Sequence, residues 1–134
     1  MDGLFLTKEN QIFNEKGDIF HIIKKSSKGF SNFGEAYFTT VKNGEIKGWK
    51  KHQKMTLNLA VPFGEVEFVI TDKHGSFKNF KLSPENYYRL TVSPNLWVAF
   101  RGLKDYNLVI NIADLEHDPD EAENIDLDNI KYEW

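Results

Sequence analysis

EAYFTTVKNGEIKGWKKHQKMTLNLAVPFGEVEFVITD, residues 35–72, is the stretch that decides the fold, because short β-type segments alternate with turns along it. Strands are expected at Glu35–Val41, Ile46–His52, Met55–Val61 and Glu65–Asp72. The Asn43-Gly44 pair between the first two is the strongest short-range signal for a β-hairpin. In the last segment, apolar side chains alternate with others, which predicts a sheet with one face in water.

The same pattern continues on both sides of this stretch. Further strands are expected at Leu4–Thr7, Gly17–Lys25, Ser76–Leu82 and in the segments YYRLTV (87–92), LWVAFRG (96–102) and YNLVINIA (106–113). Residues 10–16 and 26–34 have turn and loop composition, and Ser83 is expected to cap one helical turn. Roughly ten short strands with frequent turns, and no amphipathic helical window, predict an all-β sandwich or jelly-roll barrel.

The C-terminal tail, about residues 115–134, is acidic but ends in alternating apolar residues, Ile130, Tyr132 and Trp134. Because such anchors favour contact with a folded surface, we expect the tail to dock on the barrel. No repeat or linker divides the chain, so residues 1–134 are predicted to form a single domain.

Composition excludes several function classes. The net charge of -3 gives no basic field for nucleic acid. No apolar window is long enough for a membrane-spanning helix, and the N-terminal residues are too acidic for a secretory signal. The chain has no cysteine, which excludes disulfides and a thiol nucleophile and fits a reducing cytoplasm.

Candidate chemistry is concentrated in residues 47–61, where lysines surround His52. Strand alternation places Lys50 and His52 on one face. Ammonium groups close by favour a neutral imidazole, so this pair could transfer protons on an anionic substrate. The alternative is an exposed basic strand end with a solvated histidine.

Residues 34–72, together with SPNLWVAFRG (93–102) and the ending HDPDE…IKYEW, resemble the dTDP-4-dehydrorhamnose 3,5-epimerase (RmlC-like) family. The resemblance covers most of the chain from Gly34 to Trp134 and is nearest to the short, WxcM-like sugar epimerases. It implies a cupin jelly roll, usually a homodimer, that binds a nucleotide-linked 4-keto-6-deoxyhexose inside the barrel. It also implies an isomerase of surface-polysaccharide or deoxysugar biosynthesis that needs no metal or redox cofactor.

In this family a base, usually histidine, removes a proton beside the sugar ketone, and cationic or polar groups hold the enolate oxygen. Matching the motifs makes His52 the candidate base and places Lys50 where the family has its usual catalytic histidine. The candidate substrate-binding residues are Lys47, Asn58, Trp97, Arg101 and Asn111. Lys47 and Arg101 would bind the diphosphate, and Trp97 would stack on the substrate.

The sequence also departs from the family pattern. Leu57 stands where longer members have a lysine, and Asn111 falls near the position of their catalytic tyrosine. Lys50 and Val98 occupy places that hold ligands in metal cupins, so no metal is predicted. An aspartate of the tail could orient His52, but the sequence does not choose one. Two alternatives remain open: a catalytically inactive sugar- or nucleotide-sugar-binding cupin, and a structural partner with a filled barrel.

Overall fold

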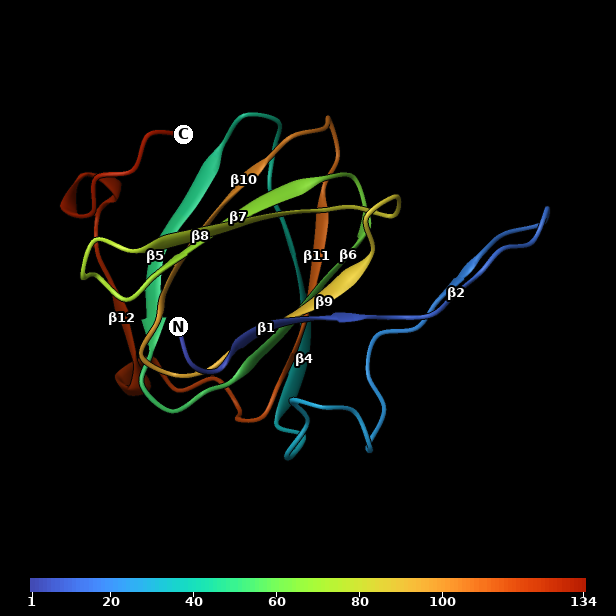
Figure 1. Cartoon of the computed structure of the whole chain (residues 1–134), viewed down its shortest axis with the longest axis horizontal. Coiled ribbons are helices and arrows are strands. Elements are labelled where there is room, and N and C mark those ends of the chain that lie inside the picture. The colour runs from blue at the N-terminus through green and yellow to red at the C-terminus, as the bar shows by residue number, and fades with distance from the viewer.

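The computed structural model describes all 134 residues, and its two five-stranded antiparallel sheets pack face to face beside a separate two-stranded sheet (Figure 1). The first sheet contains, in spatial order, β1 (Leu4–Lys8), β9 (Tyr88–Val92), β6 (Leu57–Phe63), β11 (Leu108–Ala113) and β4 (Glu35–Thr40). The second contains β12 (Ala122–Asn124), β5 (Ile46–His52), β10 (Trp97–Gly102), β7 (Val66–Thr71) and β8 (Phe77–Leu82). This arrangement confirms the predicted all-β jelly roll.

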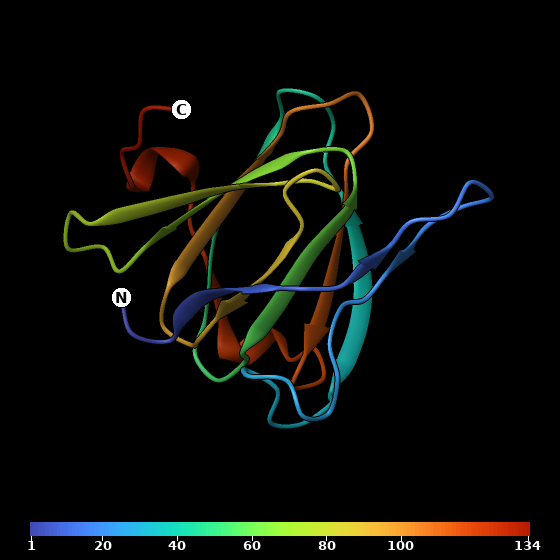
Figure 2. The ribbon, with the colours of Figure 1, turned by 45° about the vertical axis from the view of Figure 1, so that its right-hand side comes forward.

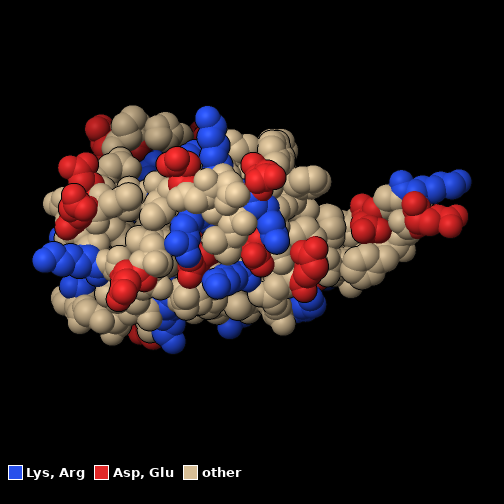
Figure 3. Space-filling model, turned by 90° about the horizontal axis from the view of Figure 1, so that it is seen from above, with Lys and Arg blue, Asp and Glu red and all other residues tan.

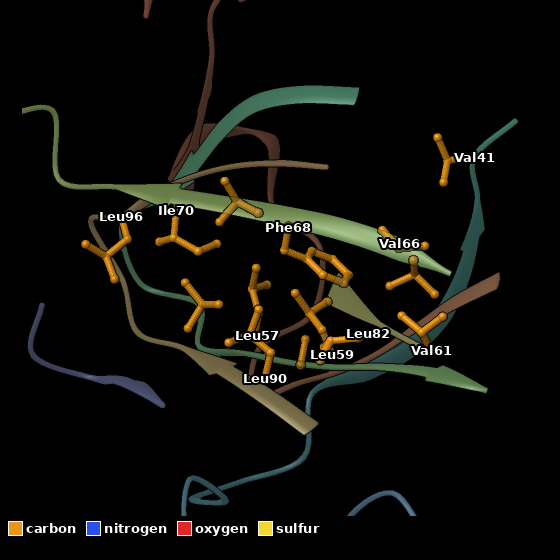
Figure 4. Packing of buried hydrophobic residues seen from close by; sticks show 14 of the residues in the cluster. Val41, Leu57, Leu59, Val61, Val66, Phe68, Ile70, Leu82, Leu90 and Leu96 are labelled. Atoms are coloured by element: carbon orange, nitrogen blue, oxygen red, sulfur yellow. The ribbon is translucent and has the colours of Figure 1, made fainter. Parts of the chain in front are cut away.

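The hydrophobic core lies between the two sheets (Figure 4). Leu59, Val61 and Leu90 of the first sheet meet Phe68 and Ile70 of the second, all of them buried. Alternate residues of each strand point inward, so the period-2 pattern of the sequence becomes this core. Each such side chain stabilises the fold by about 1.5–3 kcal/mol on burial.

The outer face of the second sheet is covered by the C-terminal tail, which corrects the expectation of a wet face on β7. All six residues of β7 are buried. Ile130 of the tail packs with Trp49 and Val69, and the ring of Trp134 lies 6.3 Å from that of Trp49. The tail includes the one-turn 3-10 helices Pro119–Glu121 and Leu127–Asn129.

The N-terminal region differs most from the prediction. In place of one strand over Gly17–Lys25, two short strands, β2 (Gln11–Ile12) and β3 (Ile19–Phe20), pair in a hairpin that projects from the body (Figures 1 and 2). The predicted helical turn at Ser83 is also wrong. The segment closes as a β-bridge to Asn86, whose backbone N–H donates to the Ser83 hydroxyl at 3.1 Å. No helix is long and apolar enough to cross a bilayer.

Candidate active site

A cavity of about 290 Å³ lies between β4, β6 and β11 of the first sheet and β5 and β10 of the second. Its apolar lining residues are Leu57, Leu59, Val98, Phe100 and Val109. The other lining residues are Tyr37, Thr39, Lys47, Gly48, Lys50, His52, Asn111 and Asn124. The barrel is therefore not filled by side chains, and its open space combines an apolar wall with a few polar groups, as small-molecule sites commonly do.

Strand β5 places two predicted catalytic residues at this cavity. Because side chains alternate along a strand, Lys50 and His52 face the cavity while Trp49 points to the opposite face. His52 is 7% exposed, and its Nδ1 is hydrogen-bonded to a carboxylate oxygen of Glu121. That bond leaves Nε2 as the ring nitrogen available to a ligand.

Glu121 is a residue that the sequence analysis did not identify. Its second carboxylate oxygen accepts the backbone N–H groups of Gln53, Lys54 and Met55 at 3.0–3.2 Å. Burial alone would raise its pKa, but the hydrogen bonds from His52 and from the backbone outweigh burial and hold the pKa below its usual value. The carboxylate is therefore charged and fixed beside the imidazole.

The tail brings Glu121 to this place. Strand β12 pairs with β5 so that Ala122 lies opposite His52, and Asn124, opposite Lys50, also lines the cavity. Glu121 precedes Ala122 at the end of a 3-10 turn that is capped by the side chain of Asp118. In the sequence, Asp118 followed by Pro119 indicates the beginning of a helical turn. Which acidic residue contacts His52 is shown only by the register between β12 and β5.

On the opposite wall, Asn111 and Tyr37 form a hydrogen-bonded pair. Asn111 Nδ2 donates to the Tyr37 hydroxyl at 3.0 Å, and Asn111 Oδ1 accepts the backbone N–H of Asn58 at 3.1 Å. Tyr37 was missed in the sequence, although the pairing of β4 with β11 sets it directly opposite Asn111. The cavity thus has an imidazole on one sheet and a phenol on the other.

Of the predicted substrate-binding residues, Lys47 and Asn111 line the cavity, whereas Asn58, Trp97 and Arg101 do not. Strand alternation is the reason, since each of these three points to the outer face of its sheet. Trp97 packs with Trp49 beneath the tail, and Arg101 pairs with Glu67 at 2.7 Å. Their contact with substrate stays a prediction, and these side chains would have to make it from outside this cavity.

Asn58 belongs to a buried network around Arg89 on the outer face of the first sheet. Its Oδ1 accepts from Arg89 and from the Thr91 hydroxyl, and its Nδ2 donates to the Gly29 carbonyl at 3.2 Å. We expect Asn58→Ala to lower the free energy of unfolding by about 1–3 kcal/mol, because it removes one of the acceptors of a buried guanidinium and the acceptor of the buried Thr91 hydroxyl. Urea unfolding measures this loss, and the KM for substrate should not change. If the variant instead had a raised KM and unchanged stability, the result would support the predicted role of Asn58 in substrate binding.

Gly48 allows β5 to approach β10 at the cavity wall. Its φ is +154°, and a Cβ added there would lie 2.3 Å from the Cβ of Ala99. We expect Gly48→Ala to destabilise the fold by about 1–3 kcal/mol through overpacking, and to lower activity by displacing Lys50 and His52. Thermal unfolding and turnover test this, with Gly75→Ala as the control for a positive-φ glycine that has open space around it. Equal losses in both variants would mean that the close approach to β10 is unimportant.

No group of three or more His, Asp or Glu side chains lies close enough to hold a metal ion. The donors at the cavity are instead one imidazole bonded to one carboxylate, two lysine ammonium groups, a phenol and two amides. Such a set can move protons and bind an anionic, hydroxyl-rich ligand.

Comparison with solved structures identifies relatives of this fold. A dTDP sugar isomerase from Desulfovibrio desulfuricans G20 is 33% identical, with a TM-score of 0.92 over 99% of this chain and 91% of that one. The sugar 3,4-ketoisomerase QdtA from Thermoanaerobacterium thermosaccharolyticum, solved with TDP, is 18% identical, with a TM-score of 0.81 over 97% and 93% of the two chains. A dTDP-4-dehydrorhamnose 3,5-epimerase from Sulfolobus tokodaii is 20% identical, with a TM-score of 0.85 over 98% and 82%.

The two more distant structures share the fold, whereas the first is similar in sequence along almost its whole length. No family model matches the chain, and no curated protein matches it in sequence. The resemblance found in the sequence is confirmed by these structures. The chain belongs to the RmlC-like cupin family of dTDP-sugar isomerases and epimerases.

Proposed function

We propose that this protein isomerises a nucleotide-linked 4-keto-6-deoxyhexose by acid–base proton transfer through an enolate. The observation that carries the proposal is the buried His52 ring, held through Nδ1 by Glu121 at the wall of a partly apolar cavity. The 33% identical relative is a dTDP sugar isomerase, and a solved complex of the ketoisomerase QdtA contains TDP-4-keto-6-deoxyglucose. The fold and the site therefore both support a nucleotide-linked ketosugar as the substrate.

The cavity size indicates which part of the substrate it would enclose. At about 290 Å³ it lies near the lower limit of small-molecule pockets, roughly 300 Å³. A single hexose ring suits this space, and the nucleotide would lie outside. Lys47 is exposed, and its Nζ lies 3.3 Å from the Thr39 hydroxyl at the cavity wall. We assign Lys47 to the diphosphate, since an ammonium group there can bind phosphate oxygens.

In the first step, the Nε2 of His52 accepts a proton from the carbon beside the ketone. The electrons of the broken C–H bond form a C=C bond, and the carbonyl oxygen becomes an enolate oxygen. Glu121 stabilises the imidazolium that results, as a carboxylate does when it accepts the Nδ1–H of a general base. We assign Lys50 to the enolate oxygen, because a cation stabilises charge that develops there.

In the second step the proton returns to carbon. If the Tyr37 phenol donates it to the opposite face of the same carbon, the product is an epimer. If instead the hydroxyl on the deprotonated carbon passes its proton to the enolate oxygen, the imidazolium can protonate the former carbonyl carbon, and the ketone moves to the neighbouring carbon. Tyr37 faces the cavity from the wall opposite His52, which suits the first route. Asn111 holds the phenol in position.

The wider setting is also a proposal. We place the enzyme in the cytoplasm, as a homodimer, in the biosynthesis of surface polysaccharides or deoxysugars. The absence of cysteine suits a reducing compartment. The class of substrate suits a pathway that consumes activated deoxysugars.

The decisive experiment is solvent exchange. Incubation with dTDP-4-keto-6-deoxyglucose in deuterated water, followed by NMR, should show deuterium at C3 or C5 if the product is an epimer, and at C4 if the ketone has moved. Tyr37→Phe should suppress epimer formation and leave exchange by His52 in place. Tight binding without any exchange, across several nucleotide-linked ketosugars, would contradict the proposal and favour an inactive sugar-binding cupin.

A further inference from the structure

Three side chains lie in a row across the cavity wall that the second sheet forms. In the strand register, Asn124 of β12 is opposite Lys50 of β5, and Lys50 is opposite Val98 of β10. All three line the cavity. Neighbouring strands lie about 4.8 Å apart, so the row is about 10 Å wide. We call it the Asn124–Lys50–Val98 row, and it presents an amide, an ammonium group and an apolar group in that order.

The amide of Asn124 has unused hydrogen-bonding capacity of both kinds. The residue is exposed, and neither end of its side chain is hydrogen-bonded within the chain. The other amide at the cavity differs, because Asn111 already donates to the Tyr37 hydroxyl and accepts the backbone N–H of Asn58. A sugar hydroxyl both donates and accepts, so Asn124 is suited to bind one.

The two other members of the row have different chemistry. Lys50 takes part in none of the four ion pairs of the chain, so its ammonium group is available to an oxygen of the ligand. Val98 is 7% exposed, and its side chain has neither donor nor acceptor. A hydroxyl placed against Val98 would lose its hydrogen bonds to water without gaining others, whereas a methyl group there would bury apolar area.

The class of sugar proposed above carries the same order of groups around its ketone. In a 4-keto-6-deoxyhexose, C3 bears a hydroxyl, C4 bears the carbonyl oxygen, and C5 bears the C6 methyl group. The diphosphate is common to all sugars linked to the same nucleotide. The face drawn in Figure 3 mixes basic and acidic side chains without a broad field of one sign. Charge therefore does not distinguish one such sugar from another, whereas the row can.

We infer that the row selects the sugar: Asn124 binds the C3 hydroxyl, Lys50 binds the oxygen at C4, and Val98 packs on the C6 methyl group. The inference rests on the proposed function, because that function places Lys50 at the ketone. It also fixes the direction in which the ring lies across β12, β5 and β10. The opposite direction would set the hydroxyl against Val98 and the methyl group against an amide.

The test is a thermodynamic cycle between Asn124→Ala and the C3 hydroxyl. Each measurement uses the His52→Asn background, in which the ligand should bind without turning over, and calorimetry gives the Kd. With dTDP-4-keto-6-deoxyglucose, Asn124→Ala should raise the Kd about 3–10-fold, as expected for the loss of one hydrogen bond. With the 3-deoxy analogue the same substitution should leave the Kd unchanged, because this ligand lacks the hydroxyl.

Glu123→Ala is the matched control on the same strand. The Glu123 carboxylate accepts from Gln53 Nε2 at 3.1 Å and pairs with the Lys51 ammonium group at 3.3 Å, and Glu123 does not line the cavity. Loss of these contacts should leave the Kd of both sugars unchanged. If Asn124→Ala weakened both sugars equally, or neither, its assignment to the C3 hydroxyl would be overturned.

The other end of the row is tested by Val98→Thr, which nearly keeps the size of the side chain and adds a hydroxyl. In the same background, Val98 should favour the 6-deoxy sugar over its 6-hydroxy analogue by about 10–100-fold in Kd. Val98→Thr should lower that preference about 3–10-fold, and thermal unfolding verifies that the variant is folded. An unchanged preference in a folded variant would overturn the placement of the methyl group on Val98.

These binding results are separate from the test of the enzymatic proposal. Solvent exchange by the wild type, with no selective effect of either substitution, would overturn this inference alone. The expected pattern of Kd values without any exchange by the wild type would overturn the enzymatic proposal alone.

Discussion

Replacing His52 by asparagine is expected to lower kcat by about 10²–10⁴-fold, because the variant loses the group that removes the proton beside the ketone. KM should change little, since Lys47 and Lys50 keep their positions at the cavity. Solvent deuterium should no longer enter the sugar ring at C3, C4 or C5. NMR of the sugar ring and steady-state kinetics measure both effects.

The matched control is His74→Asn, which alters an exposed histidine in the turn after β7. It should leave turnover and exchange at the wild-type level. If His52→Asn still exchanged deuterium, a residue other than His52 would be the base. Lys50 is then the first candidate, because it lies on the same face of the strand.

Replacing Glu121 by glutamine should lower kcat by roughly 10³–10⁴-fold while leaving most of the fold intact. The amide oxygen can still accept the backbone N–H groups of residues 53–55, so the NH₂ group must face His52. An NH₂ donor there favours the tautomer that carries its proton on Nε2, and that tautomer cannot act as the base. Kinetics together with the NMR signals of the imidazole distinguish this from simple loss of structure.

Glu121→Ala separates the structural part of the role. It removes the acceptor for three backbone N–H groups and for a buried imidazole, so the free energy of unfolding should fall by roughly 3–5 kcal/mol. Denaturant unfolding of both Glu121 variants measures the difference. If the alanine variant were as stable as the wild type, the hydrogen bonds of the Glu121 carboxylate would contribute nothing net to stability, because water would serve the same donors equally well.

The pH dependence of stability follows from the lowered pKa of Glu121. A carboxyl whose pKa is lower in the folded state stabilises the fold above its unfolded pKa, near 4.5, and loses that contribution as the pH falls through the folded value. Wild-type stability should therefore decline below about pH 4.5 more steeply than that of Glu121→Gln. Parallel curves for the two proteins would assign the acid sensitivity to other carboxyl groups.

Several features of the site were accessible from the sequence because they are local. Residues 46–52 predict a strand, and alternation along it is enough to place Lys50 and His52 on one face. The same reasoning could not choose between the two faces of strands whose outer side is also buried. Asn58, Trp97 and Arg101, predicted to bind substrate, lie on the outer faces of their strands.

The sequence by itself determined the all-β architecture, the family and the histidine-bearing strand, since hairpin signals and period-2 patterns act over a few neighbouring residues. The tertiary structure alone decided that Glu121, rather than a tail aspartate, meets His52, and that Tyr37 meets Asn111. Both contacts join residues about 70 positions apart along the chain, 69 and 74, through the register of paired strands. Register depends on how whole sheets pack, and a shift of one residue would turn each of these side chains to the opposite face.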